Sequence, residues 1–121
     1  MPIKKILVVD DSPTDRQFLL ESLSKLGFQV VLAESGEQGV AKAKSERPDL
    51  VLMDVVMPGT NGFQATRQIA RDEATKNIPV IMCTSKSQET DRIWGMRQGA
   101  KDYVVKPINM AELAAKIAAL G

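Results

Sequence analysis

The sequence predicts an α/β fold in which a five-stranded parallel sheet is doubly wound, with helices on both of its faces. Three runs of four apolar residues, Ile6–Val9, Leu50–Met53 and Val80–Cys83, do not alternate with polar residues, which is typical of strands buried on both sides. Helix start and stop signals follow each run, so strand and helix alternate along the chain. The length of 121 residues suits one domain, and we expect residues 1–121 to form it alone.

The first strand, Ile6–Val9, leads into a helix that begins at Ser12, because a serine N-cap followed by Pro13 is a common helix start. Gly27 supplies the stop. The apolar positions of this helix recur at helical spacing, at Leu19, Leu23 and Leu26. A weaker apolar run, Gln29–Ala33, is expected to form the second strand.

The next two helices are also marked by their caps. Ser35 and Gln38 have the spacing of a capping box, and Pro48 ends the helix that they open, which carries Val40 and Ala43. After the third strand, Leu50–Met53, the pair Asn61 and Gly62 opens a helix. Its apolar residues include Phe63, Ile69 and Ala70.

The fourth strand, Val80–Cys83, precedes a helix from about Gln88 to Gln98 with Ile93, Trp94 and Met96. Trp94 fits either the core of this helix or an exposed position that faces a partner. Tyr103–Val105 is the expected fifth strand. Asn109 and Glu112 have capping-box spacing and open the last helix, whose apolar stripe is Leu113, Ile117 and Leu120.

Composition excludes several classes of function. The chain has no histidine, so Ser-His-Asp and Cys-His catalysis and histidine-ligated metals are excluded within it. Its one cysteine, Cys83, cannot form an internal disulfide, which favours a reducing compartment. The net charge of +1 predicts no nucleic-acid partner. The apolar run near the N-terminus is too short for a signal peptide or a membrane span, so we expect a cytoplasmic protein without membrane insertion.

Polar side chains follow four of the five expected strands, at the carboxyl edge where open parallel sheets place their sites. Asp10 and Asp11 follow the first strand, Asp54 the third, Thr84 the fourth and Lys106 the fifth. Each alone has an ordinary explanation, such as a helix cap, a β-branched strand residue or a solvated lysine. Together they indicate a site, and we expect no comparable set at the opposite edge.

Clustered carboxylates repel one another unless a cation joins them. Oxygen ligands without histidine or cysteine favour a hard divalent ion, and Mg²⁺ fits best. Beside such an ion, Asp54 has the chemistry of a nucleophile that attacks a phosphoryl group. Lys106 would neutralise charge on the phosphoryl oxygens, and Thr84 would donate a hydrogen bond to them.

Four motifs in the correct order resemble those of the response-regulator receiver domains of two-component signalling, which have a flavodoxin-like fold. The motifs are Val8–Ser12 (VVDDS), Leu52–Gly59 (LMDVVMPG), Pro79–Ser85 (PVIMCTS) and Gly99–Pro107 (GAKDYVVKP). The resemblance covers essentially the whole chain and departs from the family pattern at none of the five chemical positions.

The resemblance implies a role for each of these residues. Asp54 is the phosphoacceptor, and Asp11, Asp54 and the backbone carbonyl of Val56 bind Mg²⁺, with Asp10 acting mostly through a metal-bound water. Lys106 contacts the phosphoryl group, and Thr84 moves toward it after transfer. Tyr103 then follows inward as the switch aromatic, which changes the face formed by the fourth helix, fifth strand and fifth helix. The Lys106–Pro107 peptide bond is expected to be cis.

The resemblance also implies the partners. The phosphoryl donor is a histidine kinase, since this chain has no histidine of its own, and the output is a downstream protein bound on the switching face. We expect a monomer with no output domain. Two segments, Met57–Gln68 and Gln88–Ala100, resemble the single-domain regulators of type IV pilus twitching motility, which work with a chemotaxis-like kinase.

Other functions remain as alternatives. A phosphate sink, or a regulator in another chemosensory pathway, would have the same site. A receiver that signals without phosphorylation would not need it intact. A haloacid-dehalogenase-like phosphatase also uses an aspartate and Mg²⁺, but it places two aspartates two residues apart, whereas Asp10 and Asp11 are adjacent. A flavodoxin-like electron carrier needs a phosphate loop after the first strand, where these two aspartates would repel phosphate.

Overall fold

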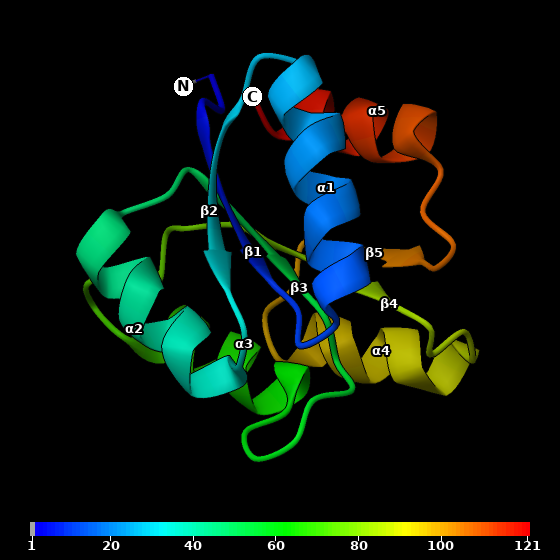
Figure 1. The fold of residues 1–121 in the computed structure, drawn as a ribbon. Coiled ribbons are helices and arrows are strands. Elements are labelled where there is room, and N and C mark those ends of the chain that lie inside the picture. Colours follow the sequence, from blue (N-terminus) through cyan, green and yellow to red (C-terminus); the bar gives the residue numbers. More distant parts are fainter. Residues whose placement is uncertain (1) are drawn as a thin grey trace.

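Five parallel strands form one sheet in the order β2-β1-β3-β4-β5 in the computed structural model, which describes residues 2–121 (Figure 1). The strands are β1 (Lys5–Val9), β2 (Gln29–Ala33), β3 (Leu50–Met53), β4 (Val80–Thr84) and β5 (Asp102–Val105). The helices are α1 (Pro13–Lys25), α2 (Gly36–Glu46), α3 (Gly62–Arg71), α4 (Glu89–Arg97) and α5 (Met110–Leu120). The predicted fold class and the order of all ten elements are therefore confirmed.

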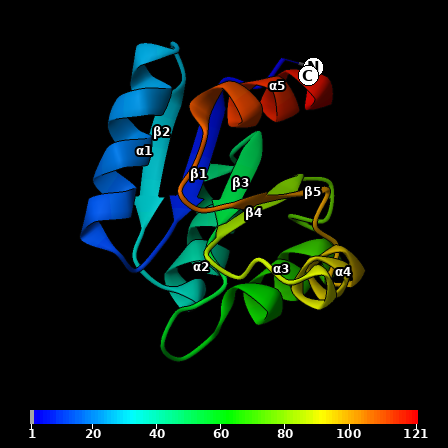
Figure 2. The ribbon, with the colours of Figure 1, turned by 90° about the vertical axis from the view of Figure 1, so that its right-hand side faces the viewer.

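The helices cover both faces of the sheet. Helices α1 and α5 lie on one face, and α2, α3 and α4 lie on the other (Figures 1 and 2). Because successive strand residues point to opposite faces, Ile6 and Val8 pack with α1 and α5, whereas Leu7 and Val9 pack with α2 and α3. Strands with apolar side chains on both faces need this double cover, which explains why their runs show no alternation.

The predicted helix caps are present, with two differences. The hydroxyl of Ser12 accepts a hydrogen bond from the Asp15 backbone N–H, and Asn61 and Gln64 form a complete capping box. The hydroxyl of Ser35 caps α2, but the Gln38 side chain bonds to the N–H of Glu34 at 2.7 Å and not to that of the cap residue. The capping box expected at Ser35 is thus only half formed. The Asn109 side chain accepts from the Glu112 N–H at 3.1 Å, but among the described residues no bond runs back from the Glu112 side chain to the Asn109 N–H, so the capping box expected there is half formed as well.

Several apolar residues are more exposed than the pattern suggests, among them Ile93, Met96 and Val105 at 46%, 41% and 40%. Leu26 caps the end of α1 and is 52% exposed, because the helix stops there and turns at Gly27. Leu120 lies in the last turn of α5 and is 37% exposed, so the buried stripe consists of Leu113 and Ile117. Trp94 is 48% exposed, which excludes the core position that was one of its two interpretations.

The topology changes direction at the carboxyl edge of the sheet, between β1 and β3. Strand β1 lies between β2 and β3, so the connections that leave β1 and β3 run to opposite faces. The opposite edge, where no comparable set was expected, carries charged residues of a different kind. The Asp49 carboxylate accepts hydrogen bonds from the backbone N–H groups of Lys4 and Lys5, and the Lys5 ammonium pairs with Glu46 at 3.0 Å. These charges are paired and tie β1 to α2 and β3.

None of the helices described between residues 2 and 121 combines the length and the apolar character needed to span a bilayer.

Candidate functional site

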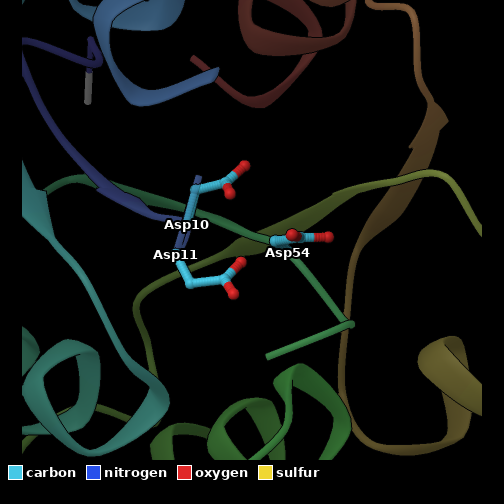
Figure 3. Close-up of side chains that lie close together, drawn as sticks. All are labelled: Asp10, Asp11 and Asp54. Carbon is cyan, nitrogen blue, oxygen red and sulfur yellow. The ribbon is translucent and has the colours of Figure 1, made fainter. Parts of the chain in front are cut away.

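Three aspartates meet at the carboxyl edge of the sheet. Asp10 and Asp11 follow β1, and Asp54 follows the neighbouring strand β3. The backbone N–H of Asp54 donates a hydrogen bond to the carbonyl of Val9 at 2.9 Å, which holds the two strand ends together. Each of the three carboxylates offers one oxygen, and these oxygens lie within 4.8 Å of one another (Figure 3). Asp10 and Asp54 are buried, whereas Asp11 is exposed to solvent.

The carboxylate of Asp10 is held by several partners. Its Oδ1 accepts a hydrogen bond from the Ser12 N–H at 2.9 Å, and its Oδ2 accepts one from the Lys106 ammonium at 2.8 Å. Its backbone carbonyl accepts a third from the Arg16 guanidinium at 2.7 Å. Both carboxylate oxygens of Asp10 are therefore engaged, as are those of Asp54, which accept from the Val55 N–H and from the Lys106 ammonium.

Asp54 lies in surroundings that disfavour its charge. Burial raises the pKa of its carboxyl group, and the negative charge of Asp10 raises it further. The positive charge of Lys106 acts in the opposite direction, as do the Val55 N–H at 2.8 Å and the Thr84 hydroxyl. The net effect is a raised pKa, with burial as its largest cause.

Lys106 brings an ammonium into this cluster from the end of β5. Its Nζ lies 2.8 Å from Asp10 Oδ2, 2.7 Å from Asp15 Oδ2 and 3.5 Å from Asp54 Oδ2. Burial alone would lower the pKa of Lys106, but the hydrogen bonds to Asp10 and Asp15 raise it, so the ammonium stays charged. The Lys106 N–H bonds to the carbonyl of Thr84 at 2.8 Å, and the following Lys106–Pro107 peptide bond is cis.

Thr84 and Tyr103 lie on the neighbouring strands β4 and β5, where the register pairs Thr84 with Val105 and Tyr103 with Met82. Thr84 ends β4 and is fully buried, and its hydroxyl accepts a hydrogen bond from the Lys86 N–H at 3.3 Å. The ring of Tyr103 on β5 is buried, and its hydroxyl donates to the Lys86 carbonyl at 2.8 Å. Burial raises the pKa of Tyr103 to about 12. The sequence predicted an inward movement of this ring, and the structure places the ring in the inward position.

A hollow of about 650 Å³ lies over α4 and β5, next to Tyr103. It is lined by the exposed apolar side chains of Ile93, Met96 and Val105, together with polar residues of the β4–α4 loop and the arginines of α4. Trp94 is exposed on the same helix but does not belong to this lining. The face that was expected to bind a partner is therefore apolar and concave near Tyr103.

Sequence reasoning missed Asp15, which bonds to Lys106 across 91 positions of the chain. Its S-x-x-D spacing from Ser12 signals a capping residue, so nothing in the sequence marked it as part of the site.

Sequence reasoning also missed how the β3–α3 loop is held. The Glu37 carboxylate at the start of α2 accepts a hydrogen bond from the Thr60 N–H at 2.7 Å, and its bonds to Thr60 lower the pKa of Glu37 to about 2. A side chain at Gly62 would collide with the backbone of Asp54 and Val55, so only glycine lets α3 begin this close to the site. Nothing in the sequence pattern marks these two contacts, because they depend on how the loop folds.

Comparison with known proteins gives a consistent result. The family described as "Response regulator receiver domain" matches residues 6–118. The chain is 56% identical over 116 residues to Protein PilH of Pseudomonas aeruginosa, and the match covers 96% of both chains. The chain spans about half the length of other curated relatives, such as the phosphate regulon regulator PhoB of Pseudomonas aeruginosa and of Escherichia coli, of which the match covers 51%.

Solved structures agree with this match. The chemotaxis protein CheY4 of Vibrio cholerae has a TM-score of 0.91 at 30% identity, over 98% of this chain and 99% of that one. The receiver domain of the sensor histidine kinase PA1611 from Pseudomonas aeruginosa has a TM-score of 0.89 at 33% identity, over 97% and 96% of the two chains. In that structure a magnesium ion is coordinated in the active site cleft.

Proposed function

Since the chain belongs to the response regulator receiver domain family, we propose that it is a single-domain phosphoacceptor regulator in which Asp54 takes a phosphoryl group from a histidine kinase. The observation that carries this proposal is the position of Asp54. It is a buried carboxylate with a raised pKa, within 4.8 Å of two further carboxylates and 3.5 Å from a lysine ammonium. The match over 96% of Protein PilH supports a regulator made of one domain.

The donor set fits Mg²⁺. Three carboxylates around one ammonium leave excess negative charge, which a divalent cation would neutralise. Asp11 and Asp54 would bind the ion directly, together with the backbone carbonyl of Val56. Asp10 would act mostly through a metal-bound water, as the family resemblance implies, while its two oxygens accept from the Ser12 N–H and the Lys106 ammonium. When bound, Mg²⁺ neutralises charge on the phosphoryl oxygens and orients them.

Asp54 acts as the nucleophile. One of its carboxylate oxygens forms a bond to phosphorus while the phosphorus–nitrogen bond of the donor phosphohistidine breaks, and the imidazole leaves with that electron pair. Asp54 must be ionised for this attack, and Lys106 favours the ionised form by lying 3.5 Å away. After transfer, the Lys106 ammonium pairs with the phosphoryl oxygens.

Thr84 and Tyr103 would couple phosphorylation of Asp54 to a change in the surface formed by α4 and β5. The Thr84 hydroxyl lies at the end of β4 next to Asp54 in the sheet and can donate a hydrogen bond to the new group. Its movement would pull the β4–α4 loop, whose Lys86 carbonyl holds the Tyr103 hydroxyl at 2.8 Å. Phosphorylation would then stabilise the buried position of Tyr103 and reshape the hollow formed by α4 and β5, where a target protein binds.

Incubation with Mg²⁺ and either acetyl phosphate or beryllofluoride tests the site. Amide NMR shifts should change around Asp54, Thr84 and Tyr103 in the wild-type protein, and Asp54→Asn should remain unchanged. Asp11→Asn serves as a second variant, in which the response should require a higher Mg²⁺ concentration. If the wild-type protein gives no Mg²⁺-dependent response, the phosphoacceptor function is wrong.

We further propose that the regulated process is type IV pilus twitching motility. The support is the 56% identity with Protein PilH, together with the segments Met57–Gln68 and Gln88–Ala100, which resemble such regulators. Deletion of the gene should alter twitching, and a plasmid copy should restore it. Unchanged motility after deletion would remove the pilus assignment and leave the phosphoacceptor function intact.

A further inference from the structure

The ammonium of Lys106 is shared among three carboxylates, and its shortest contact is with Asp15. The distances are 2.7 Å to Asp15, 2.8 Å to Asp10 and 3.5 Å to Asp54. The short bonds to Asp15 and Asp10 use two of the three N–H donors of the ammonium, and its contact with Asp54 is the longest of the three. Asp15 also differs in exposure, since its side chain is 41% exposed whereas that of Asp54 is 7% exposed.

Helix capping does not account for this contact. Ser12 and Asp15 have the spacing of a capping box, in which the acid would bond back to the Ser12 N–H. That N–H is already bound by Asp10 Oδ1 at 2.9 Å, and the Asp15 carboxylate lies against Lys106 instead. Helix α1 still has its cap, because the Ser12 hydroxyl accepts from the Asp15 backbone N–H.

From this geometry we propose that Asp15 is a positioning residue, which competes with a phosphoryl group on Asp54 for the Lys106 ammonium. This inference rests on the proposed phosphoacceptor function. Lys106 must turn from Asp15 toward the phosphoryl oxygens after transfer, and the loss of the short bond to Asp15 opposes that turn. Because Asp15 is partly exposed, water can replace the lysine at its carboxylate, so losing the Asp15–Lys106 bond costs little free energy. This small cost adjusts the stability of the phosphorylated state.

The test is the affinity for beryllofluoride at saturating Mg²⁺. Asp15→Asn removes the charge but keeps the size, and it should bind beryllofluoride about two- to five-fold more tightly than the wild type, the range expected for one partly exposed ion pair. Asp15→Glu retains the charge and should bind like the wild type. Glu21→Gln removes an equal charge from α1, where the Glu21 carboxylate accepts from the Gln17 side chain at 2.9 Å, and should also bind like the wild type.

A double variant separates competition for Lys106 from a general effect of charge. In a Lys106→Met background, Asp15→Asn should leave the affinity unchanged, because the shared group is gone. An equal gain with and without Lys106 would overturn the proposed role, and so would an Asp15→Asn affinity equal to that of the wild type. Failure of the wild-type protein to bind beryllofluoride would instead contradict the phosphoacceptor function itself.

Discussion

Replacement of Asp54 by asparagine should make the folded protein more stable at neutral pH. The carboxylate oxygens of Asp10 and Asp54 lie within 4.8 Å, which at an effective dielectric constant of about 20 corresponds to a repulsion of about 3.5 kcal/mol. The Lys106 ammonium at 3.5 Å gives an attraction of about 4.7 kcal/mol on the same scale. The repulsion and the attraction largely offset each other, so the cost of burying the Asp54 charge decides whether the substitution stabilises the protein. We expect Asp54→Asn to raise the free energy of unfolding by about 1–2 kcal/mol.

The gain should depend on pH. Because the pKa of Asp54 is raised in the folded state, protonation of its carboxyl group stabilises the folded protein. That stabilisation is complete below the unfolded value of about 3.9 and is lost as the pH rises through the folded value. The asparagine side chain of the variant does not titrate, so the advantage of the variant should be present at pH 7 and shrink as the pH falls toward 4.

Urea unfolding followed by circular dichroism measures this difference, and Mg²⁺ supplies the control. Wild-type protein should gain about 1.4 kcal/mol at a Mg²⁺ concentration ten times its Kd, whereas Asp54→Asn should gain less because it lacks one ligand. A variant that is less stable than the wild type at pH 7 without Mg²⁺ would refute the reasoning, since the attraction of Lys106 would then outweigh burial and repulsion.

Three other substitutions test how the fold holds the site. Gly62→Ala would push a methyl group into the backbone of Asp54, and it should cost about 1–3 kcal/mol in urea unfolding and slow labelling by acetyl phosphate. Tyr103→Phe should cost about 0.5–1.5 kcal/mol in the same assay, because it removes the 2.8 Å hydrogen bond to the Lys86 carbonyl; an unchanged stability would mean that water replaces this bond at no cost. Leu23→Ala empties a fully buried position between α1 and the sheet and should cost about 2–5 kcal/mol, with labelling of the folded fraction unchanged.

The strands and their order could be predicted because burial on both faces leaves a direct mark in the sequence. Runs such as Ile6–Val9 and Leu50–Met53 show no polar alternation, and the structure buries every residue of both. The five chemical residues could be named because parallel strands place their carboxyl ends on one edge. Asp10, Asp54 and Lys106 therefore meet even though they are far apart in the chain.

The remaining features depend on side-chain directions that spacing does not encode. Asp15 has a capping spacing, yet its carboxylate turns to Lys106, because Asp10 already holds the N–H that a capping acid would bind. The Gln38 side chain likewise accepts from the Glu34 N–H and not from the Ser35 N–H, a choice that the spacing does not reveal. At the opposite edge, Asp49 was overlooked because its partners are backbone N–H groups of Lys4 and Lys5, which no pattern of side chains reveals.

The central claim is that Asp54 is the residue that accepts the phosphoryl group. Wild-type protein can be incubated with Mg²⁺ and acetyl phosphate, trapped by borohydride reduction of the acyl phosphate, and mapped by peptide mass spectrometry. We predict one reduced aspartate per chain, at Asp54, and none when Mg²⁺ is removed by a chelator. Reduction at Asp10 or Asp11 in place of Asp54, or equal labelling of Asp54→Asn, would contradict the account.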